Sequence, residues 1–81
     1  MIIRLKLFAF FRQVLGAPEL SYEIAEGATA GDLIDDILRK HPSLEGSRGH
    51  VVITVNKTAV KLTDKIHEGD EVAILPPVSG G

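Results

Sequence analysis

The chain has 81 residues, 44% of them hydrophobic and 25% charged, a composition typical of one small globular domain. Its 9 basic and 11 acidic residues are interspersed and give a formal net charge of −2, so the sequence offers no basic stripe to nucleic acid. The lack of cysteine excludes disulfides, thiolate metal sites and cysteine nucleophiles, so any sulfur chemistry must be borrowed. No apolar stretch is long enough for a signal peptide or a membrane span, and we expect a cytoplasmic protein without membrane association.

The first part of the chain predicts a strand, a short helix and a returning strand. Apolar and charged side chains alternate over residues 2–7, which is the period of a half-buried strand. Residues 9–15 change to helical spacing, and Gly16 can adopt the left-handed conformation that ends a helix. Alternation returns over residues 20–24, which predicts a second strand antiparallel to the first.

The main helix is predicted to begin after Thr29 and to end by His41. Thr29 is a favourable N-cap, and Asp32 three residues later completes an approximate capping box. One face of the segment that follows is apolar and carries Leu33, Ile34, Ile37 and Leu38. Pro42 stops the helix because it has no amide hydrogen and restricts the residue before it.

The second half of the chain predicts a loop and further strands. Residues 43–50 contain two glycines and indicate a surface loop. Residues 51–55 form a β-branched run, which favours a central strand. Asn56-Lys57 predicts a tight turn into a strand at residues 59–61, and the last strand is expected at residues 71–75.

This order predicts an α+β fold of the β-grasp, or ubiquitin-like, type, in which a mixed sheet wraps around one main helix with short additional helical turns. A ferredoxin-like sandwich needs a second long helix, and residues 63–68 offer only one turn. We therefore expect a β-grasp domain at residues 1–75 and an extended, flexible tail at residues 76–81.

The tail is the most informative segment of the sequence. It consists of Pro76, Pro77, Val78, Ser79, Gly80 and Gly81. The prolines cannot donate to a sheet ladder, so we expect the chain to leave the sheet there in a stiff, extended form. Glycines have no Cβ, so they can enter a narrow channel and leave the carbonyl of Gly81 open to attack. A frayed end with two glycines by chance is the plain alternative.

The free carboxylate of Gly81 is the predicted reactive group. A carboxylate is a poor electrophile at neutral pH, so a partner enzyme must convert it to an activated species such as an acyl-adenylate made from ATP. Sulfur can then attack the carbonyl carbon to give a thiocarboxylate, or a thiol or amine can attack it to give a conjugate. We expect the tail residues before Gly81 to enter the partner's active site.

Residues 68–81, with the sequence EGDEVAILPPVSGG, resemble the C-terminal signature of the MoaD family, the small subunits of molybdopterin synthase. Residues 5–9 together with Arg12 resemble the first strand and short helix of that family. Residues 55–57 resemble its central hairpin. The resemblance covers essentially the whole chain, and the loop at residues 43–50 is its least diagnostic part.

The resemblance implies a β-grasp sulfur carrier. A ubiquitin-activating-like adenylyltransferase of the MoeB type is expected to adenylate Gly81 with ATP, after which the chain carries sulfur covalently as a thiocarboxylate. A MoaE-like large subunit is expected to take up the tail and pass the sulfur to the pterin precursor of molybdopterin. The catalytic side chains belong to that large subunit, so we expect no catalysis by this chain alone and no cofactor bound to it.

The same resemblance indicates a partner interface at Phe8, Ala59 and Leu75. Successive residues of a strand point to opposite faces, so Phe8 should be exposed where Leu7 points inward. Phe10 is a weaker candidate. Members of the family often carry an aromatic residue at the position of Leu75 and a larger apolar residue at that of Ala59, so the detailed contacts are expected to differ.

Other polar residues suggest no site. His41, His50 and His67 lack the spacing of metal ligands, and we assign no metal. Asp35 and Asp36 fall on the polar side of the main helix, where a solvated face explains them better than paired acid and base catalysis.

Three alternative functions stay open at this point. A thiamine-pathway sulfur carrier of the ThiS type shares the fold and the terminus, although Pro-Pro-Val before the glycines argues against it. A ubiquitin-like modifier would join Gly81 to lysines of other proteins and leave isopeptide-linked remnants. A passive β-grasp binding module would keep its function when Gly81 is deleted.

Overall fold

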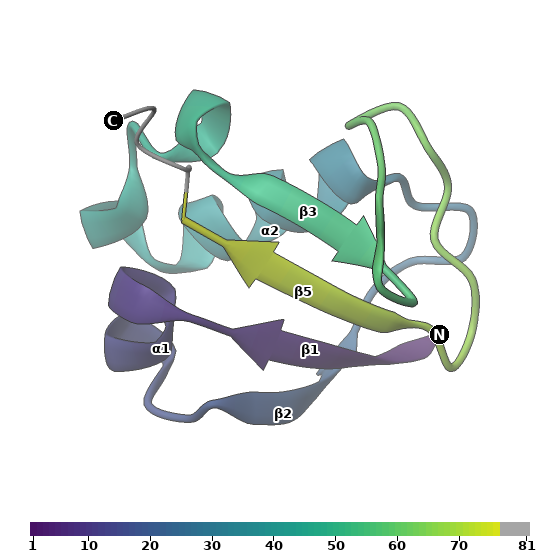
Figure 1. Cartoon of the computed structure of the whole chain (residues 1–81), viewed down its shortest axis with the longest axis horizontal. Coiled ribbons are helices and arrows are strands. Elements are labelled where there is room, and N and C mark those ends of the chain that lie inside the picture. The colour runs from purple at the N-terminus through teal and green to yellow at the C-terminus, as the bar shows by residue number, and fades with distance from the viewer. Residues whose placement is uncertain (77–81) are drawn as a thin grey trace.

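The computed structural model describes residues 1–76, whose elements are shown in Figure 1. The strands are β1 (Ile2–Leu7), β2 (Glu19–Glu23), β3 (Val52–Val55), β4 (Thr58–Ala59) and β5 (Glu71–Leu75). The helices are α1 (Ala9–Leu15) and α2 (Ala30–Lys40), and two 3-10 turns, η1 (Pro42–Leu44) and η2 (Arg48–His50), lie between α2 and β3. None of the helices within the described range has the length and apolarity that crossing a bilayer requires.

The five strands form one mixed sheet in the order β2-β1-β5-β3-β4. β1 pairs antiparallel with β2 and parallel with β5, and β5 pairs antiparallel with β3. The first and last strands of the chain are therefore neighbours, with Leu5 opposite Val72. This sheet, wrapped on the single long helix, confirms the predicted β-grasp fold.

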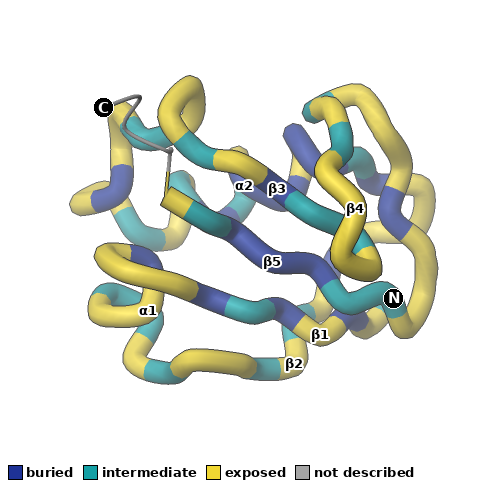
Figure 2. The backbone as a smooth tube through the Cα atoms, viewed as in Figure 1, coloured by how far each residue is buried: buried dark blue, intermediate teal, exposed yellow. Residues whose placement is uncertain are grey.

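The core lies between α2 and one face of the sheet. α2 lies behind the sheet in the view of Figure 1, and its Leu33, Ile34 and Ile37 are fully buried. The sheet contributes the alternate residues of β1 together with buried residues of β3 and β5, namely Ile3, Leu5, Leu7, Ile53, Val72 and Ile74. Figure 2 shows that β5 is the most continuously buried strand.

Both helices have the ends that the sequence predicts. The Thr29 hydroxyl accepts a hydrogen bond from the Asp32 amide at 3.1 Å, and the Asp32 carboxylate accepts one from the Thr29 amide at 3.0 Å. This capping box satisfies two amide groups that the first turn of a helix leaves free. α1 ends at Gly16, which has φ 84° and donates its amide hydrogen to the Arg12 carbonyl.

Two expectations about the strands are wrong in detail. The middle strand of the sheet is β5, which lies between β1 and β3, rather than the β-branched run of β3. β3 is also an inner strand, but its second partner is the two-residue strand β4. β4 covers Thr58–Ala59 instead of residues 59–61, although the Val60 amide still donates to the Ile53 carbonyl at 3.0 Å.

The segment at residues 43–50 is more structured than the predicted surface loop. It contains η2 and the end of η1, and Leu44 is only 1% exposed because it packs into the core. The burial of this leucine could not be predicted from the sequence, because its neighbours are glycines and polar residues that are typical of a surface loop.

Candidate functional site

The end of β5 fixes the point from which the tail leaves the domain. Ile74 lies opposite Leu7 of β1 and opposite Ile53 of β3, and the next residue, Leu75, lies opposite Val52. β5 is thus held by β1 up to Ile74 and by β3 up to Leu75, and Pro76 follows as an exposed residue without an amide hydrogen. The predicted tail residues Pro77, Val78, Ser79, Gly80 and Gly81 lie outside the described residues, so the boundary between domain and tail stays a prediction.

Apolar side chains surround this exit, and we call them the exit surface: Phe8, Phe10, Val52, Leu75 and Pro76. Phe8 is 41% exposed, Phe10 52% and Val52 37%, while Leu75 is half-buried. The strand register places Phe8 and Val52 on either side of Leu75, since Leu7 pairs with Ile74 and Val52 pairs with Leu75. Exposed apolar side chains gathered on one surface mark a place where another protein can bind.

The structure brings together two of the three predicted interface residues. Phe8 and Leu75 each follow the last β1–β5 pair, Leu7 and Ile74, so they lie at the same end of the sheet, and the expected exposure of Phe8 is confirmed. Ala59 lies two strands away on the same sheet, in the row formed by Ala73, Thr54 and Ala59. It is exposed, but it adjoins the exit surface instead of forming part of its centre. Partner contact by any of the three stays a prediction.

Val52 is a residue of this surface that sequence reasoning missed. It belongs to a β-branched run in which every residue is equally suited to a core, so no alternation reveals which side chains point outward. Only the pairing of β3 with β5 shows that Val52 shares the outer face with Leu75.

Paired charges border the apolar part of the outer face. The Arg4 guanidinium lies 2.9 Å from the Glu19 carboxylate, and the Lys6 ammonium lies 3.4 Å from that of Glu71. The hydrogen bond to Glu19, together with its charge, raises the pKa of Arg4. Because these charges are matched within the sheet, a partner on the exit surface would meet an apolar centre beside a polar rim.

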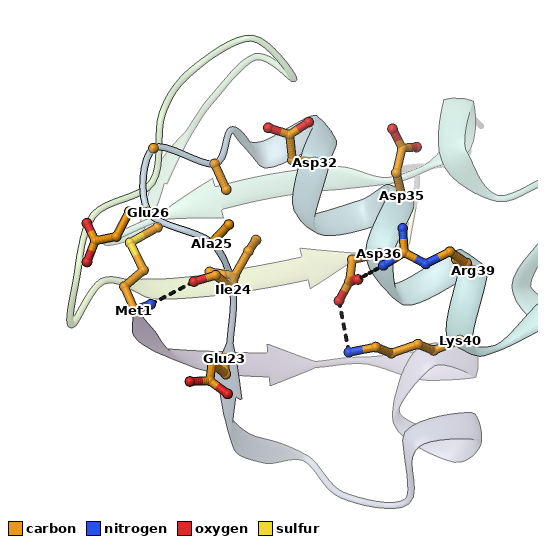
Figure 3. A pocket seen from close by; sticks show the side chains of 12 residues that line it. Met1, Glu23, Ile24, Ala25, Glu26, Asp32, Asp35, Asp36, Arg39 and Lys40 are labelled. Carbon is orange, nitrogen blue, oxygen red and sulfur yellow. Dashed lines mark hydrogen bonds and ion pairs between the residues drawn. The ribbon is translucent and has the colours of Figure 1, made fainter.

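A hollow of about 780 Å³ lies at the end of the domain opposite the tail exit, between the end of β2 and α2 (Figure 3). Several of its polar groups have partners: the amino group of Met1 donates to the Ile24 carbonyl at 2.7 Å, and Asp36 pairs with Arg39 and Lys40. Asp36 is therefore not simply solvated, whereas Asp35 is exposed and pairs with Arg48 at 2.6 Å. These ion pairs hold the polar side chains on the α2 side of the hollow, and none of the lining residues is near Pro76 in the sequence.

The three histidines lie apart. His41 caps the end of α2, His50 lies in η2, and the Nδ1 atom of His67 lies 3.9 Å from the Asp70 carboxylate. Within residues 1–76, no three side chains of the metal-binding types come together as a possible ion site.

Comparison with known proteins finds a matching family and relatives of similar length. The sequence profile of the ThiS family matches residues 5–81. A molybdopterin synthase sulfur carrier subunit of Chlamydomonas reinhardtii is 40% identical over 83 residues, with 100% of both chains covered. Small archaeal modifier protein 1 of Haloferax volcanii is 37% identical, with 94% of this chain and 97% of the relative covered.

A solved structure agrees with the fold. The structure of a putative molybdopterin converting factor subunit 1 from Pyrococcus furiosus superposes with a TM-score of 0.83 at 32% identity. The superposition covers 96% of this chain and 99% of that one.

Proposed function

Because this chain belongs to the ThiS family, we propose that it is the sulfur carrier subunit of a molybdopterin synthase. The observation that carries the proposal is the end-to-end alignment, at 40% identity, with a molybdopterin synthase sulfur carrier subunit. The placement of the tail exit beside an apolar surface supports it, since a carrier must present its end to partner proteins.

The reactive group in this proposal is the carboxylate of Gly81, which must be the last residue of the mature protein. A carboxylate oxygen attacks the α-phosphorus of ATP on an adenylyltransferase of the MoeB type, and pyrophosphate leaves. A sulfur nucleophile at the oxidation level of sulfide then attacks the carbonyl carbon and displaces AMP. The chain thereby becomes a thiocarboxylate and binds no cofactor of its own.

The described part of the chain contributes position rather than catalysis. β5 is anchored by β1 up to Ile74 and by β3 up to Leu75, so the segment after Pro76 starts from a rigid point. A rigid origin limits the volume that a short tail searches, which favours its entry into a partner's active site. The catalytic side chains then come from the partner.

The proposed sulfur acceptor is the pterin precursor of molybdopterin, bound to a MoaE-like large subunit. The dithiolene of molybdopterin requires two sulfur atoms, and each carrier delivers one, so carriers must exchange or be reloaded between the two transfers. We propose that this cycle runs in the cytoplasm, which supplies the ATP.

The test is the intact mass of the full chain after incubation with its adenylyltransferase, ATP and a sulfur donor. We expect a gain equal to the replacement of one oxygen by sulfur, located by fragmentation at Gly81. Omission of ATP and deletion of Gly81 are the two controls, and neither should show the gain. An unchanged mass in the complete reaction would refute the proposal.

A second function is favoured by one observation, the 37% identity to a small archaeal modifier protein. Such a modifier uses the same activated Gly81 and differs only in the nucleophile, which is a lysine amine of another protein. Isopeptide-linked remnants of this tail on digested cell proteins would establish it. Their absence from cells that contain the thiocarboxylate form would leave sulfur transfer as the function of the tail.

A further inference from the structure

A small apolar pocket opens beside the tail exit. The N-terminal turn of α1 provides one wall with Phe8, Phe10 and Phe11. The opposite wall is formed by His50 of η2 and by Val51, which follows it. Pro76, the last described residue, completes the lining. The pocket has a volume of about 150 Å³, and a cavity of roughly this size lined by apolar side chains accepts a benzene ring.

The walls of this pocket are held in place by the domain itself. Phe11 is buried in the core, and Leu44 anchors the opposite loop. From Leu44, two hydrogen bonds continue to the pocket: the Ser47 amide donates to the Leu44 carbonyl at 3.1 Å, and the His50 amide donates to the Ser47 carbonyl at 2.8 Å. A preformed pocket binds an apolar group without the entropy cost of ordering its walls.

One backbone feature at the pocket also indicates a binding role. Ala9, which also lines it, has φ 52°, a conformation that residues other than glycine adopt at a cost of about 1 kcal/mol. This conformation lies between Phe8 and Phe10, the two aromatic residues that form the rim. Strain of this kind is commonly found where a surface serves binding.

We propose that this pocket receives one aromatic or branched aliphatic side chain of the synthase large subunit, and that Phe10 is the main contact on this chain. The proposal rests on the proposed function, because a large subunit that encloses residues 77–81 must pass over Pro76 and therefore over the mouth of the pocket. The volume admits a single ring or branched chain, and the exposed rim of Phe8 and Phe10 becomes buried on binding. A few apolar contacts in preformed pockets usually dominate the binding energy of an interface.

The variant Phe10→Ala tests the proposal, and Ile2→Ala is its matched control. Phe10 and Ile2 are 52% and 45% exposed, so neither truncation removes a core side chain. Ile2 begins β1, whereas Phe10 lies beyond the other end of that strand, next to the exit. Calorimetric titration of each full-length variant with the large subunit should show a Kd about tenfold weaker for Phe10→Ala and changed by less than about twofold for Ile2→Ala.

Two further measurements complete the experiment. Nuclear Overhauser contacts between the Phe10 ring and one apolar side chain of the large subunit are expected in the complex. Thiocarboxylate formation by the adenylyltransferase should fall less than the affinity for the large subunit in Phe10→Ala, because an enzyme that releases its product after each turnover needs smaller contacts than a subunit that stays bound. An equal loss in both steps would overturn the assignment to the large subunit.

Other outcomes separate this proposal from the proposed function. If the wild-type chain gains sulfur and binds the large subunit, but Phe10→Ala binds equally well, only the pocket proposal fails. If the wild-type chain gains no sulfur in the complete reaction, the intact mass refutes the proposed function itself. Contacts of Phe10 with Val78 in the isolated chain, or a dimer that Phe10→Ala abolishes, would assign the pocket to the tail or to a second copy and overturn the proposal.

Discussion

The Tyr22 hydroxyl on β2 donates a hydrogen bond of 2.5 Å to Oδ2 of Asp36 on α2. The same carboxylate oxygen lies 3.2 Å from the ammonium group of Lys40, which stands 5.1 Å from the centroid of the Tyr22 ring. This cluster joins the edge strand of the sheet to the main helix outside the apolar core, and it makes two consequences measurable.

Replacing Tyr22 with phenylalanine should lower the free energy of unfolding by about 1 to 3 kcal/mol at neutral pH, because the hydrogen bond to a charged acceptor is lost while the ring is kept. Urea unfolding of both proteins measures the difference. Since Asp36 keeps Arg39 and Lys40 as partners, a loss far above this range would indicate that the ring has moved as well.

The same variant should be less sensitive to acid. The hydrogen bond from Tyr22 is the main cause that lowers the pKa of Asp36 below 3.8, and Lys40 lowers it further. A carboxyl group whose pKa is lowered by folding stabilises the folded protein at pH values above its ordinary pKa. This contribution is lost as the pH falls through the pKa that the group has in the folded protein. Between about pH 6 and about pH 3, the free energy of unfolding should therefore fall less for Tyr22→Phe than for wild type. An equal loss in both proteins would contradict this assignment.

Gly31→Ala should destabilise the domain although alanine favours helices. A Cβ at Gly31 would lie 3.0 Å from the carbonyl oxygen of Leu62, which also accepts the Gly31 amide hydrogen at 2.8 Å. We expect a net loss of about 1 kcal/mol, because overpacking outweighs the gain in helix propensity. Gly49→Ala is the control, since nothing lies within 4 Å of its Cβ position, and it should not lower the midpoint of urea unfolding.

Lys57→Gly should stabilise the hairpin between β3 and β4. Asn56 and Lys57 have φ of 51° and 73°, the pattern of a tight turn that favours glycine at its second position. Removing the strain of a left-handed lysine should raise the free energy of unfolding by about 1 kcal/mol. Lys57→Ala removes the same side-chain charge and keeps the strain, so a comparable gain in that variant would show that charge is the cause.

Leu33→Ala should cost about 2 to 5 kcal/mol, because Leu33 is fully buried between α2 and the sheet and its truncation leaves a cavity. Thermal and urea unfolding measure the loss, which is a large share of the stability of so small a domain. A loss below about 1 kcal/mol would mean that the core closes around the missing side chain.

Phe8→Asp should strongly weaken binding to the proposed large subunit while changing the free energy of unfolding by less than about 1 kcal/mol. Phe8 is partly exposed and occupies the N-cap position of α1 without a side-chain cap, a position where aspartate is favourable. Titration and urea unfolding on the same samples separate the two effects. Equal losses in both would show that Phe8 acts mainly as a core residue.

Local patterns predicted the elements well. The alternation of β1, the capping box of Thr29 and Asp32, the stop at Gly16 and the turn at Asn56-Lys57 each depend on residues a few positions apart. Their physical causes are backbone conformation, hydrogen bonding within one turn and side-chain direction, all of which a short stretch of sequence determines.

Features that depend on distant pairing were harder to predict. The sequence suggested β3 as the central strand, and only the parallel pairing of β1 with β5 gives that place to the last strand. Leu44 was assigned to a surface loop, yet it packs into the core across α1 and α2. In both cases the outcome depends on which far segment supplies the neighbouring surface.

The proposed tail chemistry and the family resemblance came from the sequence alone, because they depend on the kinds and order of residues from Glu68 to Gly81. The resemblance pointed to Phe8 and Leu75, but only the tertiary structure showed that they surround the exit from β5 together with Phe10 and Val52. These residues lie in three separate parts of the chain, so their proximity arises only when burial of the α2 face brings the first and last strands together.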